Sequence, residues 1–342
     1  MDYITPLIRE IGDNNGWYNA QKLLDKAPTA NLLYVCGERR IGKTVYFQYL
    51  MCKMYQTYGK TTMWLRNQKV EFQNENFYES FLNFADMFPD LNVADWETEK
   101  DAVYDQDSNK VCEFQSVSTF SNRRGNASPD MEMMVFDEFM PESRKYPSNC
   151  ATGIMSLTKT VFSGRHHARL FMLSNYVSAA NPYFAKFRIY PNPKKDISVF
   201  YEGGIAIEVC RGYKRAIEHG NPWNRIYQAG GYQDYATADE DPLNELIQKV
   251  PKGAEMSPYV LLIGGNYYMI WHKNGYHYAD LYKNKLNGLD VITPNVQEAG
   301  QGVRLIESWH REYIKEMFGY NQLRFRNPNV MYDILSIVFD AV

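Results

Sequence analysis

The chain has 342 residues, of which 45% are hydrophobic, so it can bury two modest cores, and global disorder is excluded. Its net charge of −3 excludes a generally basic nucleic-acid coat but is compatible with a local basic channel. The five cysteines are scattered without a CxxC pair, which argues against a disulfide framework or a zinc site and suits a reducing cytoplasm.

Neither end of the chain nor its interior predicts a membrane segment. No apolar stretch reaches the roughly 18 residues that span a bilayer. The N-terminal MDYITPLIRE lacks a basic region followed by an apolar run, so it is not expected to be a signal peptide. We therefore expect a soluble protein that does not contact a membrane.

Short apolar runs alternate with helical patterns along residues 1–213. In chain order, strands are predicted at 31–36, 61–66, 102–104, 111–117, 131–136, 169–173, 197–201 and 205–209, and helices at 44–55, 73–86 and 153–162. Strands that alternate with helices favour a parallel sheet with helices on its faces, which is an α/β fold.

The pattern changes after residue 213. Residues 214–250 contain GNPW, AGGY and the acidic ATADEDP, and they predict a helical linker with turns. Residues 251–342 predict a small α+β domain. Its expected strands are 259–263, 267–271 and 276–280, and its expected helices are 301–318 and 327–338.

A glycine-rich segment joins the first of these strands to the helix that follows it. Such a turn points backbone N–H groups at phosphate oxygens, and its glycines adopt conformations that a Cβ would block. The lysine would reach the β- and γ-phosphates, and the threonine hydroxyl would coordinate Mg²⁺. The predicted nucleotide-binding residues of this P-loop are Gly37, Glu38, Arg39, Arg40, Ile41, Gly42, Lys43 and Thr44. We expect them to bind ATP with Mg²⁺.

The apolar strand at 131–136 ends in Asp137 and Glu138, which is the Walker B pattern. We expect Asp137 to hold Mg²⁺ together with Thr44, and Glu138 to act as the general base that activates water. Two solvated acids at a strand end are common, but downstream of a P-loop the catalytic interpretation is favoured. A glutamate at this position favours an ATPase that hydrolyses ATP to do work.

The next strand, 169–173, is followed by Ser174 and Asn175, and Asn175 is predicted to sense the γ-phosphate or the attacking water. Arg165 and Arg169 precede and open that strand. In ring ATPases, an arginine from a neighbouring subunit completes the active site. Without further information, however, a surface loop is the better explanation of Arg165. Lys69 and the pair Arg123–Arg124 could likewise contact phosphate or lie in solvated loops.

Together these motifs resemble one family, the DNA-packaging ATPases of phi-29-like tailed bacteriophages, which are small relatives of the large terminases. The segments that carry the resemblance are WYNAQK at 17–22, VFDEF at 135–139, TVF at 160–162, LSNYVS at 173–178, NPYF at 181–184, GY at 319–320 and LRF at 323–325. The resemblance covers most of the chain and is densest through residues 15–190.

The resemblance implies a ring of identical subunits, pentameric in the family, that sits on the portal of a procapsid and drives double-stranded DNA inside. The family's trans-acting arginine falls on Arg165 and a second trans-acting basic residue falls on Lys69. Arg169 matches a further family arginine. Some relatives use a packaging RNA, and nothing in this sequence shows whether this chain does. The implied location is the host cytoplasm, with transient binding to the procapsid and absence from the mature virion.

The predicted fold is therefore an ASCE-type P-loop ATPase domain at 1–213, a linker at 214–250, and a small RNase H-like domain at 251–342. The resemblance implies that this last domain is a nuclease that has lost its activity. Two-metal nucleases need clustered carboxylates, and the predicted hairpin offers none, while Asp280 and Asp290 lack evident partners. We expect no nuclease activity from this domain. We expect it instead to dock on the portal or to contact DNA.

Two other functions remain open at this point. A cellular DNA translocase or helicase of the same ATPase class would need only DNA to stimulate ATP hydrolysis. An interaction protein that uses ATP as a switch would hydrolyse it hardly at all, which the presence of Glu138 disfavours.

Overall fold

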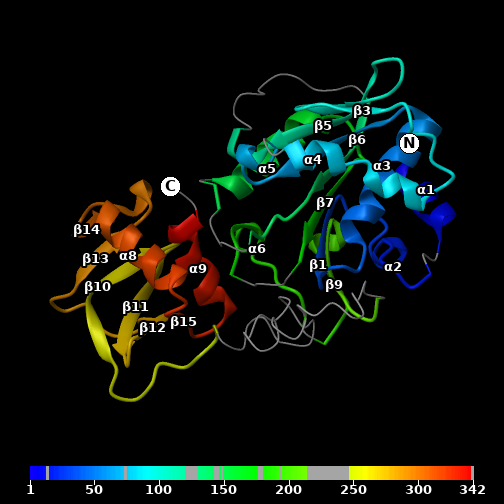
Figure 1. Cartoon of the computed structure of the whole chain (residues 1–342). Helices are drawn as coiled ribbons and strands as arrows, with labels where there is room; N and C mark the ends of the chain where they lie inside the picture. Colours follow the sequence, from blue (N-terminus) through cyan, green and yellow to red (C-terminus); the bar gives the residue numbers. More distant parts are fainter. Residues whose placement is uncertain are drawn as a thin grey trace, which may run out of the picture. The chain divides into compact units, whose positions relative to one another are not determined.

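The computed structural model describes residues 1–12, 15–72, 75–119, 130–141, 146–147, 149–175, 180–192, 194–213 and 246–339 (Figure 1). The chain divides into two compact units. Unit 1 takes Met1–Val177 and Pro191–Glu240, and unit 2 takes Ser178–Tyr190 and Asp241–Val342. Helix α6 (Pro182–Phe187), which the sequence-based boundary at residue 213 groups with the first domain, belongs to unit 2 because it packs against α9 (Pro328–Phe339). Most of the predicted linker, at 214–245, lies outside the described residues.

Among the described residues of unit 1, nine strands form one sheet in the order β3-β4-β5-β2-β6-β7-β1-β9-β8. Their bounds are β1 Leu32–Gly37, β2 Thr61–Arg66, β3 Glu97–Thr98, β4 Ala102–Tyr104, β5 Lys110–Ser116, β6 Met131–Phe136, β7 Arg169–Ser174, β8 Ile197–Phe200 and β9 Ile205–Cys210. The run from β5 to β9 is parallel, and β3, β4 and β8 add antiparallel pairs at the two edges. One strand, β7, separates β1 from β6, so the predicted ASCE-type arrangement is confirmed.

One face of this sheet is covered by α1 (Ile4–Ile11), α2 (Gln21–Lys26) and α3 (Lys43–Tyr58). Alternate residues of β1, such as Leu33 and Val35, point into the same apolar core as Phe47 of α3. The other helical segments of unit 1 are α4 (Glu75–Ser80), α5 (Cys150–Val161), η1 (Lys69–Phe72), η2 (Asn83–Met87) and η4 (Tyr201–Gly203). Within the described residues, no helix combines the length and apolar character needed to cross a bilayer.

The single helix predicted at 73–86 is wrong, because the segment forms α4 and then the separate turn η2. The break lets Phe81 pack edge-on against Trp64, with ring centroids 5.2 Å apart, while Phe84 is also buried. Burial of both rings therefore outweighs the preference for one continuous helix.

Unit 2 contains a second sheet in the order β14-β13-β10-β11-β12-β15. Its strands are β10 Glu255–Ile263, β11 Asn266–Lys273, β12 Tyr276–Leu281, β13 Asp290–Thr293, β14 Val303–Leu305 and β15 Leu323–Phe325. Two antiparallel hairpins join β10, β11 and β12, as predicted, and β13 and β14 continue the sheet in parallel. Apart from β15, which pairs in parallel with β12, this order and these directions are those of an RNase H-type sheet, as predicted.

The core of unit 2 lies between this sheet and the helices α8 (Ser308–Gly319) and α9. A short turn, η5 (Val296–Glu298), lies between β13 and β14 in the sequence. The helix predicted at 301–318 is wrong over its first third, because Val303–Leu305 pairs with β13 as strand β14. Gly302, with φ at 91°, has a backbone conformation that does not continue a helix. The helix therefore begins only at Ser308.

Candidate functional site

The carboxyl ends of the central parallel strands of unit 1 meet at one edge of the sheet (Figure 1). The P-loop follows β1, the acidic pair follows β6, and Asn175 follows β7, which lies between them. Because adjacent parallel strands lie roughly 4.8 Å apart, side chains at these three ends can contact one another.

The backbone of the P-loop depends on its two glycines. A Cβ on Gly37 would lie 2.7 Å from Cβ of Cys210 on the neighbouring strand β9, so only glycine fits there. Gly42 has φ at 91° and directly precedes α3. These constraints turn the chain sharply from β1 into α3, whose first turn has unpaired N–H groups.

Lys43 lies beneath this loop and is 5% exposed. Its Nζ donates hydrogen bonds to the carbonyl oxygens of Gly37, at 3.1 Å, and Glu38, at 2.5 Å. Burial lowers the pKa of Lys43, whereas the nearby Cys210 and Asp137 act in the opposite direction and raise it. The ammonium group is thus kept inside the curve of the loop, where phosphate oxygens would be received.

Thr44 and Asp137 come together from α3 and the end of β6. The Thr44 hydroxyl donates to Oδ1 of Asp137 at 3.3 Å. Burial raises the pKa of Asp137, while Nη2 of Arg66, 3.2 Å from Oδ2, counteracts that effect. A hydroxyl and a carboxylate in contact offer the hard oxygen ligands that Mg²⁺ prefers.

Glu138 is held by three neighbouring residues. Its backbone is left-handed, with φ at 55°, and its carbonyl oxygen accepts a 2.7 Å hydrogen bond from Nδ2 of Asn67. Its carboxylate pairs with Nη1 of Arg66 at 2.7 Å and accepts a 3.4 Å hydrogen bond from Nδ2 of Asn175. The side chain is still 45% exposed, so water can reach it.

Sequence reasoning missed the roles of Arg66, Asn67 and Glu71. All three follow from strand order, since β2 lies beside β6 and brings Arg66 level with Asp137. Glu71 lies 3.7 Å from the guanidinium of Arg66, and burial raises the pKa of Glu71. A polar residue at the end of a strand was the available signal. The same segment carries Lys69, which is exposed at the start of η1.

Arg165 and Arg169 lie at the opposite edge of the sheet, at the amino ends of the strands. Arg165 donates to the carbonyl oxygens of Met131, at 3.0 Å, and Val161. Arg169 is 2% exposed and pairs with Asp2 at 3.1 Å, while its Nε donates to the carbonyl of Ala30. The structure does not bring Arg169 to the P-loop, and its contacts support a role in fastening the N-terminus to the sheet.

Two predicted features fall outside the described residues. They are the pair Arg123–Arg124 and the segment 176–178 of the LSNYVS motif. The NPYF segment is described, and within it Asn181 caps α6 by accepting a 2.9 Å hydrogen bond from the backbone N–H of Phe184.

Three carboxylates in the described part of unit 2 each pair with a different arginine. Asp280 pairs with Arg326 at 3.6 Å, and Asp290 pairs with Arg304 at 2.9 Å. Asp333 of α9 pairs with Arg188 and accepts a hydrogen bond from Tyr268. Within the described part of the chain, no group of three acidic, histidine or cysteine side chains could hold a metal ion.

The sequence profile of a family described as "Podovirus DNA encapsidation protein (Gp16)" matches residues 12–333. The chain belongs to this family. The family expected from the sequence motifs is therefore confirmed.

Individual relatives agree with this assignment. The DNA packaging protein of Bacillus phage PZA is 30% identical over 335 residues, which cover 94% of this chain and 98% of that protein. The structure of the Phi-28 gp11 DNA packaging motor has the same fold, with a TM-score of 0.71 at 19% identity over 96% of this chain and 98% of that one. The N-terminal domain of the DNA packaging ATPase from phage phi29 is 29% identical, with a TM-score of 0.51, over 57% of this chain and 97% of its own.

Proposed function

We propose that this chain is the ATP-hydrolysing subunit of a motor that moves double-stranded viral DNA into a procapsid through its portal. Its family, which is that of phage DNA encapsidation proteins, assigns the task of packaging. The observation that carries the ATPase part is the convergence of Lys43, Thr44, Asp137 and Glu138 at one sheet edge.

The P-loop backbone and Lys43 would bind the phosphates of ATP. Lys43 would exchange its hydrogen bonds to the carbonyl oxygens of Gly37 and Glu38 for bonds to phosphate oxygens. The exchange needs little movement of Lys43, because the phosphates would bind in the same loop that holds these two carbonyl groups. Thr44 and Asp137 would hold Mg²⁺, and the hydroxyl–carboxylate contact between them fits this ion. The bound ion would neutralise charge that develops on the phosphates.

Glu138 would act as general base. It would accept a proton from a water molecule as the water oxygen bonds to the γ-phosphorus and the bond to the bridging oxygen of ADP breaks. Asn175 contacts the same carboxylate and could report the presence of the γ-phosphate. Arg66 offsets the charge of two adjacent carboxylates, which would otherwise repel each other.

Further residues would come from a neighbouring subunit. Lys69 is exposed at the P-loop edge, and Arg165 lies at the other edge, too far along β6 to reach the P-loop of its own chain. Both are proposed to act in trans in a ring of identical subunits, pentameric as in the family. A structure similar in fold to this chain is that of the bacteriophage Phi-29 genome packaging motor assembly, which supports a multi-subunit arrangement.

Unit 2 is proposed to dock on the portal or contact DNA without cleaving it. Two of its carboxylates, Asp280 and Asp290, are each paired with a different arginine, which supports the absence of a two-metal centre. The site of action would be the host cytoplasm and the procapsid, not the mature virion.

A DNA-protection assay tests the function. The protein, purified procapsids of the phage that encodes it, linear double-stranded DNA and ATP are mixed, and external nuclease is then added. We expect full-length DNA to survive only with ATP, and not with a non-hydrolysable analogue. ATP hydrolysis stimulated by DNA alone, with no procapsid-dependent protection, would instead indicate a cellular-type translocase.

A further inference from the structure

Strand β9 carries a buried carboxylate that the proposed hydrolysis does not use. Glu208 is 2% exposed and stands among the apolar residues of IAIEVC. Its two carboxylate oxygens accept hydrogen bonds from the hydroxyl groups of Tyr18, at 3.2 Å, and Tyr213, at 2.8 Å. We call Tyr18, Glu208 and Tyr213 the tyrosine clamp. Burying an ionisable side chain costs free energy of folding unless it is hydrogen-bonded. We therefore expect the buried Glu208 and its two hydrogen bonds to have a role.

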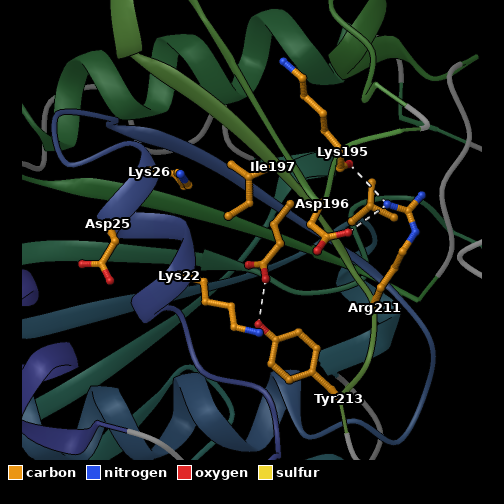
Figure 2. A pocket seen from close by; sticks show the side chains of 10 residues that line it. Lys22, Asp25, Lys26, Lys195, Asp196, Ile197, Arg211 and Tyr213 are labelled. Atoms are coloured by element: carbon orange, nitrogen blue, oxygen red, sulfur yellow. Dashed lines mark hydrogen bonds and ion pairs between the residues drawn. The ribbon is translucent and has the colours of Figure 1, made fainter.

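Charged side chains surround the clamp without replacing the phenols as donors. Figure 2 shows the pocket beside Tyr213, where Lys22 reaches toward its ring and Arg211 turns toward Asp196. Lys22 Nζ lies 5.3 Å from the centre of the Tyr213 ring, and Arg211 pairs with Asp196 at 3.2 Å. The short contacts to Glu208 itself come from the two tyrosines.

The first tyrosine of the clamp contacts the P-loop directly. The backbone N–H of Tyr18 donates to the carbonyl oxygen of Ile41 at 2.9 Å. The preceding residue, Trp17, lies beside Gly42, with Cε3 3.7 Å from where a Cβ on that glycine would lie. The Tyr18 ring also packs edge-on against Tyr46 of α3 at 5.5 Å. The position of Tyr18 therefore constrains the loop and the helix that follows it.

The second tyrosine of the clamp lies where the chain leaves the sheet. Tyr213 comes three residues after Cys210, the last residue of β9, and its ring centroid is 5.3 Å from that of Tyr18. Through its two hydrogen bonds, Glu208 thus connects the chain segment after β9 with Tyr18, whose backbone N–H binds the carbonyl oxygen of Ile41 in the P-loop.

We infer that Tyr18, Glu208 and Tyr213 are positioning residues for the phosphate-binding loop. Loosening the clamp weakens ATP binding and leaves the hydrolytic step unchanged. This follows because the clamp touches the loop, whereas Glu138 is held by a separate set of residues, Arg66, Asn67 and Asn175. The inference rests on the proposed ATPase function.

The test uses Tyr18→Phe and Tyr213→Phe in the full-length protein, since both variants keep the ring and lose one hydroxyl donor. A net hydrogen-bond contribution of about 1 kcal/mol corresponds to a rise in KM for ATP of about fivefold, with kcat within about twofold of wild type. Tyr201→Phe is the matched control, because Tyr201 is 61% exposed in the same unit.

A second pair of variants separates positioning from stability. Glu208→Leu removes the acceptor of both buried phenol hydroxyls and should raise KM. Glu208→Gln keeps a carbonyl oxygen for the phenols and should restore KM toward the wild-type value.

Unchanged KM in Tyr18→Phe and Glu208→Leu would overturn the inference, and so would a fall in kcat at constant KM. Failure of the wild-type protein to hydrolyse ATP at all would instead refute the proposed function, so the two failures are distinguishable.

Discussion

Both units of this chain are built on a mixed sheet, yet the carboxylate side chains of the two units have different arrangements of neighbours. In unit 1, Asp137 and Glu138 share Arg66, and they contact Thr44 of α3 and Asn175 after β7. In unit 2, Asp280 and Asp290 are each paired with a separate arginine, Arg326 and Arg304. The number of acids is therefore less informative than where strand ends converge. A reactive site forms where parallel central strands bring unlike side chains to one edge.

Lys43→Ala should have the largest effect on ATP binding. Lys43 is buried beneath the P-loop, and its loss removes the charge-assisted hydrogen bonds to phosphate, so ATP affinity should fall by roughly 100-fold or more. The measurement is equilibrium binding of a fluorescent ATP analogue. Lys53→Ala is the control, since Lys53 lies on the same helix but pairs with Asp90 at the surface. Tight binding by the Lys43 variant would contradict the assignment of the P-loop.

Glu138→Gln should separate binding from hydrolysis. The amide keeps the shape of the side chain but cannot accept a proton from water, so kcat should fall by roughly 10² to 10⁴ while ATP still binds. Steady-state phosphate release measures kcat, and Glu202→Gln, an exposed glutamate of unit 1, serves as the control. Wild-type turnover in the Glu138 variant would exclude it as the general base.

The trans role of Arg165 can be tested by mixing inactive subunits. Arg165→Ala alone should lose roughly 10³-fold in kcat, by analogy with other trans-acting arginines. Mixed with Glu138→Gln subunits, it should recover part of the activity, because some interfaces then combine an intact Glu138 with an intact Arg165. Absence of recovery at every mixing ratio would argue for action within one subunit or for no catalytic role.

Glu208 predicts a pH dependence of stability within unit 1. Burial raises the pKa of Glu208 from 4.5 to about 7, although Tyr213, Tyr18 and Lys22 favour the charged form, and Asp196 opposes it. Between those two values the folded state binds more protons than the unfolded state, so stability falls as pH rises. The loss amounts to about 3 kcal/mol and is complete above the folded-state pKa.

Thermal unfolding measured from about pH 5 to about pH 8 checks this prediction. The wild-type Tm should fall across that window, and the fall should be smaller in Glu208→Gln, which does not titrate. Equal slopes for the two proteins would show that other groups cause the dependence.

The smallest effect is expected in unit 2. The double variant Asp280→Asn with Asp290→Asn removes two surface ion pairs, each worth about 1 kcal/mol or less, so ATP hydrolysis and DNA protection should change by less than about twofold. Incubation of plasmid DNA with wild-type protein and Mg²⁺ or Mn²⁺ should leave it intact. Cleavage by the wild type that disappears in the double variant would show a working nuclease centre.

The P-loop and the acidic pair could be predicted from the sequence because each is a continuous run next to a strand or helix. Asn175 could be predicted because it ends the next strand in the chain. Arg66 and Asn67 could not be found in this way, because their contacts with Glu138 depend on β2 lying beside β6, which only strand order reveals.

Other gaps have the same physical origin. The partner of Arg169 is Asp2, which is far away in sequence, and no local pattern links the two. In unit 2, β13, β14 and β15 have only three or four residues each, too few to show a period of two. Pairing with longer neighbours determines these strands, so their existence depends on the rest of the sheet.

The position of Arg165 has a consequence for how subunits are counted. Strand β6 begins at Met131, which Arg165 contacts, and ends beside Asp137, roughly 20 Å away for six residues at about 3.3 Å each. Under the proposed arrangement, each complete catalytic centre belongs to an interface and not to a subunit. A closed ring then has as many centres as subunits, whereas an open arc has one fewer, so closure itself completes the last centre.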